Sequence, residues 1–463
     1  MCGIVGSNQT SFDAAATVHS LQHRGVDYQN SFIQDGVFLG HTRLSIIDLD
    51  DEANQPMYFD EIAIVFNGEI YNYQKLKEKH GLNCKTQSDT EVIIRLYQKY
   101  GKECVNLLDG MFAFCLYDFK EKSFFCARDR FGKKPFYYFF KNGKFYFASE
   151  IKAIIKMLGF TPKMDKQALF EYLAYQTPLV PNTFYEDIKK LPASNTLSLH
   201  NSALTIQPYY SFNNLNTIHT EEKKVYDEIK TLLLESVKKR LVGDVEVAVL
   251  LSGGLDSSLI TALYSKLSDQ KLHTFSIGYD THKKYCELSE AKKVAQFLQT
   301  EHNEITIGKK EFLETIDAVL DHLDEPLADS ACIPTYILSK HIHEKGFKVC
   351  LSGEGSDELF LGYDSYFDIL KKEDQKTYTY QSRSHTFSKE QMQQLLTCDF
   401  EYPKHSIETN YNLVNSFTYI DFSLWIAEVL MSKVDRMSMA HSLELRAPFM
   451  DRKLVEYMLQ TDS

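Results

Sequence analysis

The chain has 463 residues, of which 44% are hydrophobic and 13% aromatic, enough apolar side chain to bury the cores of two or three domains. Its formal net charge of −12 argues against general binding to nucleic acid or to an anionic membrane, because both partners attract a basic surface. No apolar run reaches about 18 residues and no signal-peptide pattern opens the chain, so we expect a protein that is neither membrane-spanning nor secreted. Nine scattered cysteines without Cys-x2-Cys spacing suit the reduced cytoplasm.

The first residues suggest a nucleophile at the N-terminus. Removal of Met1 would leave Cys2 with its thiol beside a free α-amino group. A thiol with an ordinary pKa of about 8.5 and an amine with one of about 7.7 to 8.0 place a nucleophile and a base in one residue. Met-Cys alone carries little information, and the alternative is a small buried cysteine.

Four polar motifs follow Cys2, at residues 23–27, 41–48, 66–72 and 88–91. Together these motifs are similar to the glutaminase domain of class II glutamine amidotransferases. Glutamine is a zwitterion, so the glutaminase site that the resemblance implies needs a fixed cation for the α-carboxylate and fixed acceptors for the α-ammonium. Each motif also has a local alternative. Arg43 could form a surface ion pair, Asn67-Gly68 could be a hairpin turn, and Asp89 could cap a helix.

Aromatic and β-branched runs through the first ~200 residues predict antiparallel sheet. Residues 110–118, 123–129, 136–140 and 144–148 are typical of a meander whose strands are separated by Asp, Lys and Asn-Gly turns. Helical patterns intervene at 91–100 and 151–156.

The second half of the chain alternates strands and helices. Periodicity lapses around 213–217, and we place the boundary so that residues 1–210 and 211–463 form two domains. An amphipathic helix over 225–237 precedes apolar strands, and helical patterns separate the strands at 245–251, 272–277, 303–307 and 347–351. This alternation predicts a doubly wound parallel sheet.

The most informative motif is Ser252-Gly253-Gly254-Leu255-Asp256-Ser257-Ser258, between an apolar strand and an apolar helix. Glycines at a helix N-terminus let backbone N–H groups approach an anion, which makes the segment a phosphate cradle. Asp256 would repel a phosphate unless a cation lay between them, and this predicts Mg²⁺. An ordinary strand-to-helix turn is the alternative for a lone Ser-Gly-Gly.

A second polar turn, residues 350–360, follows the last predicted strand. Glu354, Asp357 and Glu358 would repel one another unless a cation or an electrophilic centre lay nearby, and the alternative is a solvated acidic turn. Lys433 and Arg436 could neutralise departing pyrophosphate, or could be ordinary charges on an amphipathic helix.

The seven-residue loop resembles the signature of PP-loop ATP pyrophosphatases, which cleave ATP between the α and β phosphates, and the motifs after Cys2 are similar to the glutaminase domain of class II glutamine amidotransferases. The whole chain resembles glutamine-dependent asparagine synthetases. The resemblance implies an α+β N-terminal αββα sandwich of the N-terminal nucleophile type, followed by an α/β PP-loop domain. Val26 stands where the family usually has proline, and Leu361 where glycine is common.

For the glutaminase, the resemblance implies that Cys2 is the nucleophile and that Asn67 and the Gly68 N–H form the oxyanion hole. Arg43 would hold the α-carboxylate, and Glu69 with Asp89 the α-ammonium. The expected glutamine-binding residues are Arg43, Leu44, Ser45, Ile46, Ile47, Asn67, Gly68, Glu69 and Asp89.

For the synthetase, the resemblance implies that Glu354 acts near the acyl-adenylate, that Asp256 and Asp357 hold Mg²⁺, and that Leu250 and Ile277 flank the nucleotide. The expected ATP-binding residues are Leu250, Ser252, Gly253, Gly254, Asp256, Ser257, Ser258, Ile277, Ser352 and Gly353.

The expected reaction is an ATP-dependent transfer of ammonia from glutamine, through a sequestered path, to the β-carboxylate of aspartate, activated as acyl-AMP. Two alternatives stay open: another acceptor such as a sugar acid of a surface polysaccharide, or a glutaminase with a decayed synthetase half. The chain stops at Ser463 where relatives usually continue, so we expect a short synthetase domain. We expect no nucleic-acid or membrane partner and allow for a homodimer.

Overall fold

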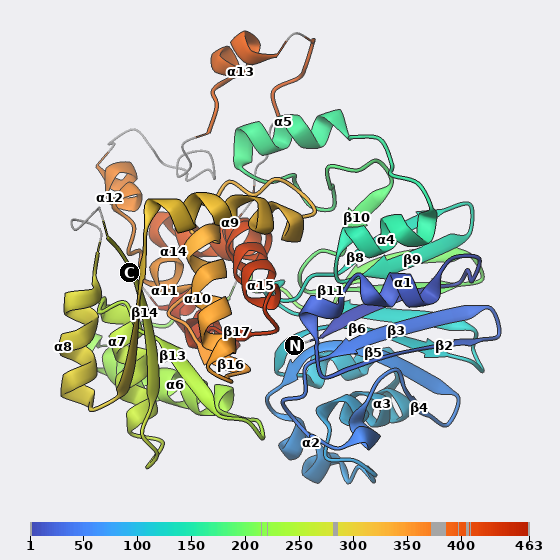
Figure 1. The fold of residues 1–463 in the computed structure, drawn as a ribbon, viewed down its shortest axis with the longest axis horizontal. Helices are drawn as coiled ribbons and strands as arrows, with labels where there is room; N and C mark the ends of the chain where they lie inside the picture. The colour runs from blue at the N-terminus through green and yellow to red at the C-terminus, as the bar shows by residue number, and fades with distance from the viewer. Residues whose placement is uncertain are drawn as a thin grey trace.

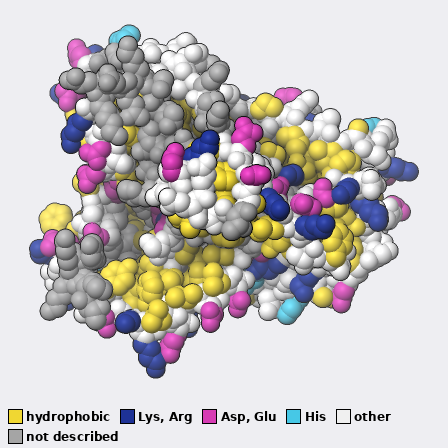
Figure 2. Space-filling view, turned by 90° about the horizontal axis from the view of Figure 1, so that it is seen from above, with side chains coloured by type: hydrophobic (Ala, Val, Ile, Leu, Met, Phe, Trp, Pro, Cys, Tyr) yellow, Lys and Arg dark blue, Asp and Glu magenta, His cyan; other side chains and the backbone are white. Residues whose placement is uncertain are grey.

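The computed structural model describes residues 2–213, 215–219, 221–280, 286–371, 386–396, 398–403, 407 and 409–461. Figure 1 shows two bodies side by side, a sandwich of antiparallel strands at the right and a parallel sheet with helices at the left. Among the described residues, no helix is long and apolar enough to cross a membrane. On the face drawn in Figure 2, acidic and basic side chains are interspersed.

The N-terminal body is a four-layer αββα sandwich, as expected. One sheet runs β10 (Ile188–Lys190), β8 (Tyr137–Lys141), β9 (Lys144–Ala148), β1 (Gly3–Ser7), β3 (Val37–Arg43) and β2 (Tyr28–Gln34). The other runs β12 (Ala203–Pro208), β11 (Asn195–His200), β7 (Ser123–Arg128), β6 (Gly110–Asp118), β5 (Ile62–Ile70) and β4 (Met57–Phe59).

Alternating side chains of these strands build the core between the two sheets, because every second residue of a strand points to the same face. Helices α1 (Ala14–His19) and α4 (Ile151–Leu158) pack on the outer face of the first sheet. Helices α2 (Tyr73–His80) and α3 (Asp89–Tyr100) pack on the outer face of the second sheet. The predicted helices at 91–100 and 151–156 are confirmed.

The predicted single meander over 110–148 is wrong. The β6–β7 hairpin belongs to one sheet and the β8–β9 hairpin to the other. The chain crosses between the sheets just after β7, where the buried Asp129 carboxylate accepts the backbone N–H groups of Phe112, Phe131, Lys133 and Lys134. Strand patterns predict the strands, but they do not show where the chain passes from one sheet to the other.

The C-terminal body contains a five-stranded parallel sheet, which confirms the doubly wound prediction. Its order is β15 (Glu301–Ile307), β14 (His273–Tyr279), β13 (Val247–Leu250), β16 (Val349–Leu351) and β17 (Glu444–Arg446). The short strand β17 has no counterpart among the predicted strands. The order reverses between β13 and β16, and ligands of such sheets bind at the carboxyl ends of the strands at this reversal.

The helices described around this sheet are α6 (Glu222–Arg240), α7 (Leu255–Ser265), α8 (Leu288–Leu298), α9 (Lys309–His322), α10 (Cys332–Glu344), α11 (Ser356–Phe360), α12 (Asp364–Leu370), α14 (Leu413–Ile420), α15 (Met431–Met439) and α16 (Arg452–Gln460). Helix α5 (Lys166–Tyr175) shares a hydrophobic cluster with α12 and α14, and α13 (Lys389–Leu395) contributes Met392 to it. A π-helical segment, Asp421–Leu430, joins α14 to α15. The predicted boundary after residue 210 falls between β12 and α6 and stays a prediction.

Candidate active sites

Cys2 immediately precedes β1, an interior strand of the first sheet, and is 8% exposed. Its backbone nitrogen donates to Asn67 Oδ1 at 3.0 Å, and Arg24 Nε donates to its carbonyl oxygen at 3.1 Å. Burial raises the pKa of the Cys2 thiol, although a backbone hydrogen bond with Leu44 opposes the shift. Since the thiolate is the reactive form, this cysteine needs a base close by.

Asn67 and Gly68 lie inside strand β5, paired with Ala113 and Phe112 of β6. The alternative of a hairpin turn at these residues is therefore wrong. Asn67 is fully buried; its Oδ1 accepts from Cys2, whereas its Nδ2 has no hydrogen-bond partner among the described residues. A Cβ at Gly68 would lie 2.0 Å from the Met111 carbonyl oxygen, so only glycine fits. A buried free donor beside the thiol is the arrangement that an oxyanion hole requires.

Glu69 and Asp89 place two buried carboxylates near these donors. Asp89 is the first residue of α3 and its Oδ2 accepts the Ile70 N–H at 2.9 Å. The helix cap is Ser88, which accepts the Thr90 N–H at 3.1 Å, so Asp89 is not the N-cap. Burial raises the pKa of Asp89 to about 7 and raises that of Glu69 well above its usual range. A bound ammonium would reverse both shifts, because a nearby positive charge favours the ionised form.

Arg43 is buried and holds the loop that follows β3. Its Nη1 donates to Asp50 O and Asn54 Oδ1, and its Nη2 to Ile47 O and Asp48 O. Because a guanidinium carries five N–H donors, these bonds leave the Nε–H for a substrate carboxylate. The expected contact with glutamine is thus restricted to one donor. Among the expected binding residues Leu44, Ser45, Ile46 and Ile47, the Arg43 side chain bonds to the backbone of Ile47 only.

The phosphate cradle joins the carboxyl end of β13 to α7, at the reversal of strand order. Gly253 has φ +86°, and a Cβ there would lie 2.4 Å from the Ala291 nitrogen. The Ser252 N–H and hydroxyl both bond to the Ser257 hydroxyl, and the Gly254 N–H bonds to Ser252 Oγ at 3.2 Å. The Ser258 hydroxyl is buried and has no hydrogen-bond partner among the described residues.

The loop after β16 lies against this cradle because β13 and β16 are neighbours. Ser356 Oγ donates to Asp256 Oδ1 at 2.7 Å, and a Cβ at Gly353 would lie 3.4 Å from Asp256 Cβ. The Ser352 hydroxyl is buried, again without a hydrogen-bond partner in the described part of the chain. Leu250 and Ile277, which lie on β13 and β14, are half-buried. The two synthetase motifs therefore meet at one edge of the sheet.

Two carboxylates fit the chemistry of a magnesium site. Asp256 and Asp357 lie in the first turns of α7 and α11, which follow the two adjoining loops, and they offer the hard oxygen ligands that Mg²⁺ prefers. No group of three or more metal-ligating side chains occurs among the residues that the structure describes. This suits Mg²⁺, which usually takes one or two carboxylates and completes its shell with phosphate oxygens and water.

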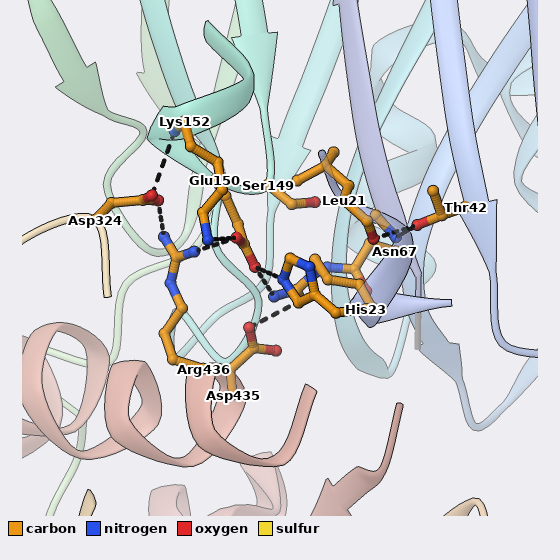
Figure 3. Close-up of polar contacts among 12 residues, drawn as sticks. Leu21, His23, Thr42, Asn67, Ser149, Glu150, Lys152, Asp324, Asp435 and Arg436 are labelled. Carbon is orange, nitrogen blue, oxygen red and sulfur yellow. Dashed lines mark hydrogen bonds and ion pairs between the residues drawn. The ribbon is translucent and has the colours of Figure 1, made fainter. Parts of the chain in front are cut away.

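Lys433 and Arg436 lie three residues apart on α15 but reach different neighbours. Lys433 Nζ lies 3.2 Å from Glu354 and 3.5 Å from Asp329, in the synthetase site. Arg436 is paired with Asp324 at 2.8 Å and with Glu150 of the sandwich at 3.1 Å (Figure 3). The structure therefore places Arg436 in the contact between the domains, away from the carboxylates that surround Lys433.

This contact contains a buried ion-pair network that sequence reasoning missed. Arg24 of the sandwich bridges Glu150 at 3.0 Å and Asp435 of α15 at 2.8 Å. Asp324 Oδ2 accepts the Ile151 N–H at 2.6 Å, so it caps helix α4 of the other domain. No local pattern marks these pairs, since their members are up to hundreds of residues apart in the chain.

Comparison with known proteins shows which family the chain belongs to. Residues 1–210 match the family model of the glutamine amidotransferase domain, and residues 228–463 match that of asparagine synthase. Glutamine-hydrolysing asparagine synthetase 1 of Bacillus subtilis is 32% identical, with 98% of this chain and 80% of the relative aligned. Asparagine synthetase 3 of the same organism is 30% identical, with 99% and 80% aligned. The chain belongs to the family of glutamine-hydrolysing asparagine synthetases, which are ATP-dependent ligases.

Proposed function

We propose that Cys2, freed by loss of Met1, hydrolyses glutamine and that the resulting ammonia amidates aspartate at the PP-loop site. The observation that carries the glutaminase half is the free, buried Nδ2 of Asn67 beside Cys2. A buried donor without a partner lowers the stability of the folded protein by about 1–3 kcal/mol. Such a donor can stabilise a negative oxygen that forms next to it during the reaction.

In the glutaminase half, the α-amine of Cys2 takes the thiol proton, and the sulfur attacks the side-chain carbonyl carbon of glutamine. Asn67 Nδ2 and the Gly68 N–H stabilise the oxyanion. The α-ammonium of Cys2 returns this proton to the amide nitrogen, and collapse of the intermediate breaks the C–N bond, releases ammonia and leaves a γ-glutamyl thioester. Water then hydrolyses the thioester to glutamate and frees the Cys2 thiol. Glu69 and Asp89 hold the substrate's α-ammonium, and the Arg43 Nε–H meets its carboxylate.

In the synthetase half, the N-terminus of α7 and the hydroxyls of Ser252, Ser257 and Ser258 bind ATP phosphates. The β-carboxylate of aspartate attacks the α-phosphorus, so the bond to pyrophosphate breaks and aspartyl-AMP forms. Lys433 offsets the charge that develops on pyrophosphate, and the paired Glu354 lies beside the acyl carbon. Mg²⁺ held by Asp256 and Asp357 would supply charge neutralisation on the phosphates. Ammonia then displaces AMP and gives asparagine.

A small interdomain cavity supports a sheltered route for ammonia. Its walls combine the apolar side chains of Met111, Val434, Leu445 and Ala447 with the polar side chains of Tyr71, Lys133, Lys134 and Asp435. Met111 is the strand neighbour of Glu69 in the glutaminase site, and Leu445 is the strand neighbour of Cys350, which leads into the synthetase loop. Ammonia that avoids bulk water stays unprotonated and nucleophilic, so a path through this cavity would link the two reactions.

The acceptor is tested by incubating the protein with ATP, Mg²⁺ and ammonium chloride, with aspartate, glutamate or glucuronate supplied separately. We expect asparagine, AMP and pyrophosphate, detected by mass spectrometry, with aspartate alone. A uronic-acid amide would establish the sugar-acid alternative, whereas glutamine hydrolysis without AMP formation from any acid would indicate a decayed synthetase. Formation of ADP would contradict adenylation altogether.

A further inference from the structure

Glu69 of the glutaminase site receives its cationic partner from the other domain. Arg446 Nη2, on strand β17 of the parallel sheet, lies 3.5 Å from Glu69 Oε1. The second oxygen, Oε2, is buried and has no hydrogen-bond partner among the described residues. One oxygen therefore faces a fixed cation, and the other is available to a substrate.

Arg446 is rigidly held. Its side chain is fully buried; Nη1 donates to the carbonyl oxygens of Arg240 at 2.7 Å and Val242 at 2.6 Å, and Nε donates to Glu444 Oε1 at 2.5 Å. These bonds fix the plane of the guanidinium and thereby hold Nη2 in its position facing Glu69. Arg446 contributes a positive charge that opposes the effects of burial and of Glu444 on the pKa of Glu69.

The segment that anchors Arg446 also anchors the glutamine loop. Immediately after Val242, the Asp244 N–H donates to Ile46 O at 2.8 Å, and Asp244 Oδ2 accepts the Asp48 N–H at 2.7 Å. Residues 240–244 of the synthetase domain thus fix Arg446 on one side and the expected glutamine-binding backbone on the other. The glutaminase pocket is built from both domains.

We propose that Arg446 is a positioning residue for glutamine hydrolysis: it orients Glu69 and favours its ionised form, so that the α-ammonium of glutamine meets a carboxylate. The inference rests on the proposed role of Glu69. If Arg446 has this role, the glutamine site is complete only when the synthetase domain is in place, because the cation beside Glu69 comes from β17.

The backbone of Arg446, unlike its side chain, contacts the synthetase site. Its carbonyl oxygen accepts the Ser352 N–H at 2.9 Å, at the start of the second synthetase loop. A side-chain substitution leaves that bond intact. Variants of Arg446 should therefore separate glutamine-dependent synthesis from ammonia-dependent synthesis, which a merely destabilised protein would lose together.

The test compares the full-length variants Arg446→Lys and Arg446→Gln, with Arg128→Lys as the matched control. Arg128 is also a buried arginine that pairs across the domains, with Glu428 at 3.2 Å, but it does not contact Glu69. For Arg446→Gln we expect the glutamine KM to rise about tenfold or more with a smaller change in kcat, because the ammonium loses an ionised partner. Arg446→Lys should fall between this variant and the wild type, and Arg128→Lys should match the wild type.

The pH profiles of the variants test whether Arg446 acts through Glu69. Asp89 and Glu444 are the other carboxylates that act on Glu69, and the pKa of Asp89 is itself about 7, so the shift of the limb between the wild type and Arg446→Gln, and not its position, reports on Glu69. Loss of the cation raises the pKa of Glu69, so the acid limb of kcat/KM for glutamine should move to higher pH in Arg446→Gln. In Glu69→Gln, adding Arg446→Lys should cost nothing further in KM. Ammonia-dependent asparagine synthesis should stay within about twofold of the wild type, since the Ser352 bond persists.

An unchanged glutamine KM and pH limb in Arg446→Lys and Arg446→Gln, in protein that retains ammonia-dependent synthesis, would overturn the proposal. If Arg446→Gln does not fold, the test rests on Arg446→Lys and on the comparison of Glu69→Gln with and without Arg446→Lys. Failure of the proposed function looks different: wild-type protein would then show no glutamine hydrolysis, or hydrolysis that Cys2→Ala leaves intact.

Discussion

The two polar atoms of the Asn67 side chain differ in their hydrogen bonding. Its oxygen anchors the Cys2 nitrogen, and its Nδ2 has no partner within the described structure. Substituting Asn67→Ala should lower kcat for glutamine hydrolysis by about 10²–10³, the usual cost of losing one oxyanion donor. Steady-state kinetics measures this, and ammonia-dependent synthesis serves as the internal control. A loss below tenfold would place the oxyanion elsewhere.

Asp89 should make glutamine binding depend on pH. Burial raises the pKa of this carboxyl to about 7, so below that pH it is increasingly protonated and attracts the substrate ammonium less. We expect the glutamine KM of the wild type to rise as the pH falls from 8 to about 6, and Asp89→Asn to raise KM and to weaken this dependence. Ser88→Ala is the neighbouring control: it removes the helix cap, costs about 1 kcal/mol of stability, and should keep the pH dependence.

At the scale of elements, the turn between β13 and α7 contains two adjacent glycines with different constraints. Gly253 has φ +86° and backbone of α8 within 2.4 Å of its ideal Cβ, whereas Gly254 has φ −67° and would meet only Ser252 Oγ at 3.3 Å. Gly253→Ala should lower the free energy of unfolding by about 1–3 kcal/mol and abolish ATP-dependent pyrophosphate release.

Gly254→Ala is the matched control, and it should retain most of the stability in a urea titration. Equal losses of stability and of pyrophosphate release in the two variants would show that the left-handed conformation of Gly253 is not what forms the phosphate cradle. Leu361 illustrates the same constraint: it has φ +57°, a left-handed conformation that glycine adopts more easily.

At the scale of the whole molecule, α15 joins the two sites. Lys433 faces the synthetase carboxylates, while Asp435 and Arg436 pair with Arg24 and Glu150 of the sandwich. A buried ion pair tolerates the loss of one partner poorly, because the other charge is left without compensation. The helix is therefore fixed to both domains by charge as well as by packing.

Substituting Asp435→Ala leaves Arg24 and Lys134 without this partner and should cost about 3–5 kcal/mol, measured by urea unfolding. Lys141→Ala, which breaks a solvent-exposed pair with Asp187, should lower the free energy of unfolding far less. Similar losses of stability in the two variants would show that the buried pair at the interface contributes no more than an exposed pair. Arginine neighbours hold the pKa of Asp435 below its usual range, so its contribution is complete above about pH 4 and is lost as the pH falls through the lowered folded value.

Periodicity and turn chemistry were sufficient to predict the antiparallel and parallel parts, helices α3 and α4, and the strand-to-helix setting of the phosphate loop. These features are local, since each depends on a short window of side chains and backbone conformations. Family resemblance added the residue roles. The three-residue strand β17 escaped prediction because it is too short for a period to show.

Sequence by itself therefore determined the two kinds of sheet, the two chemical motifs and their order along the chain. Only the tertiary structure decided that Asn67-Gly68 lies within a strand, that the β6–β9 segment divides between two sheets, and that Arg436 pairs with Glu150. It also placed Arg446 beside Glu69. The physical reason is that buried charges are satisfied by partners close in space and distant in sequence, whereas a sequence pattern reports only neighbours along the chain.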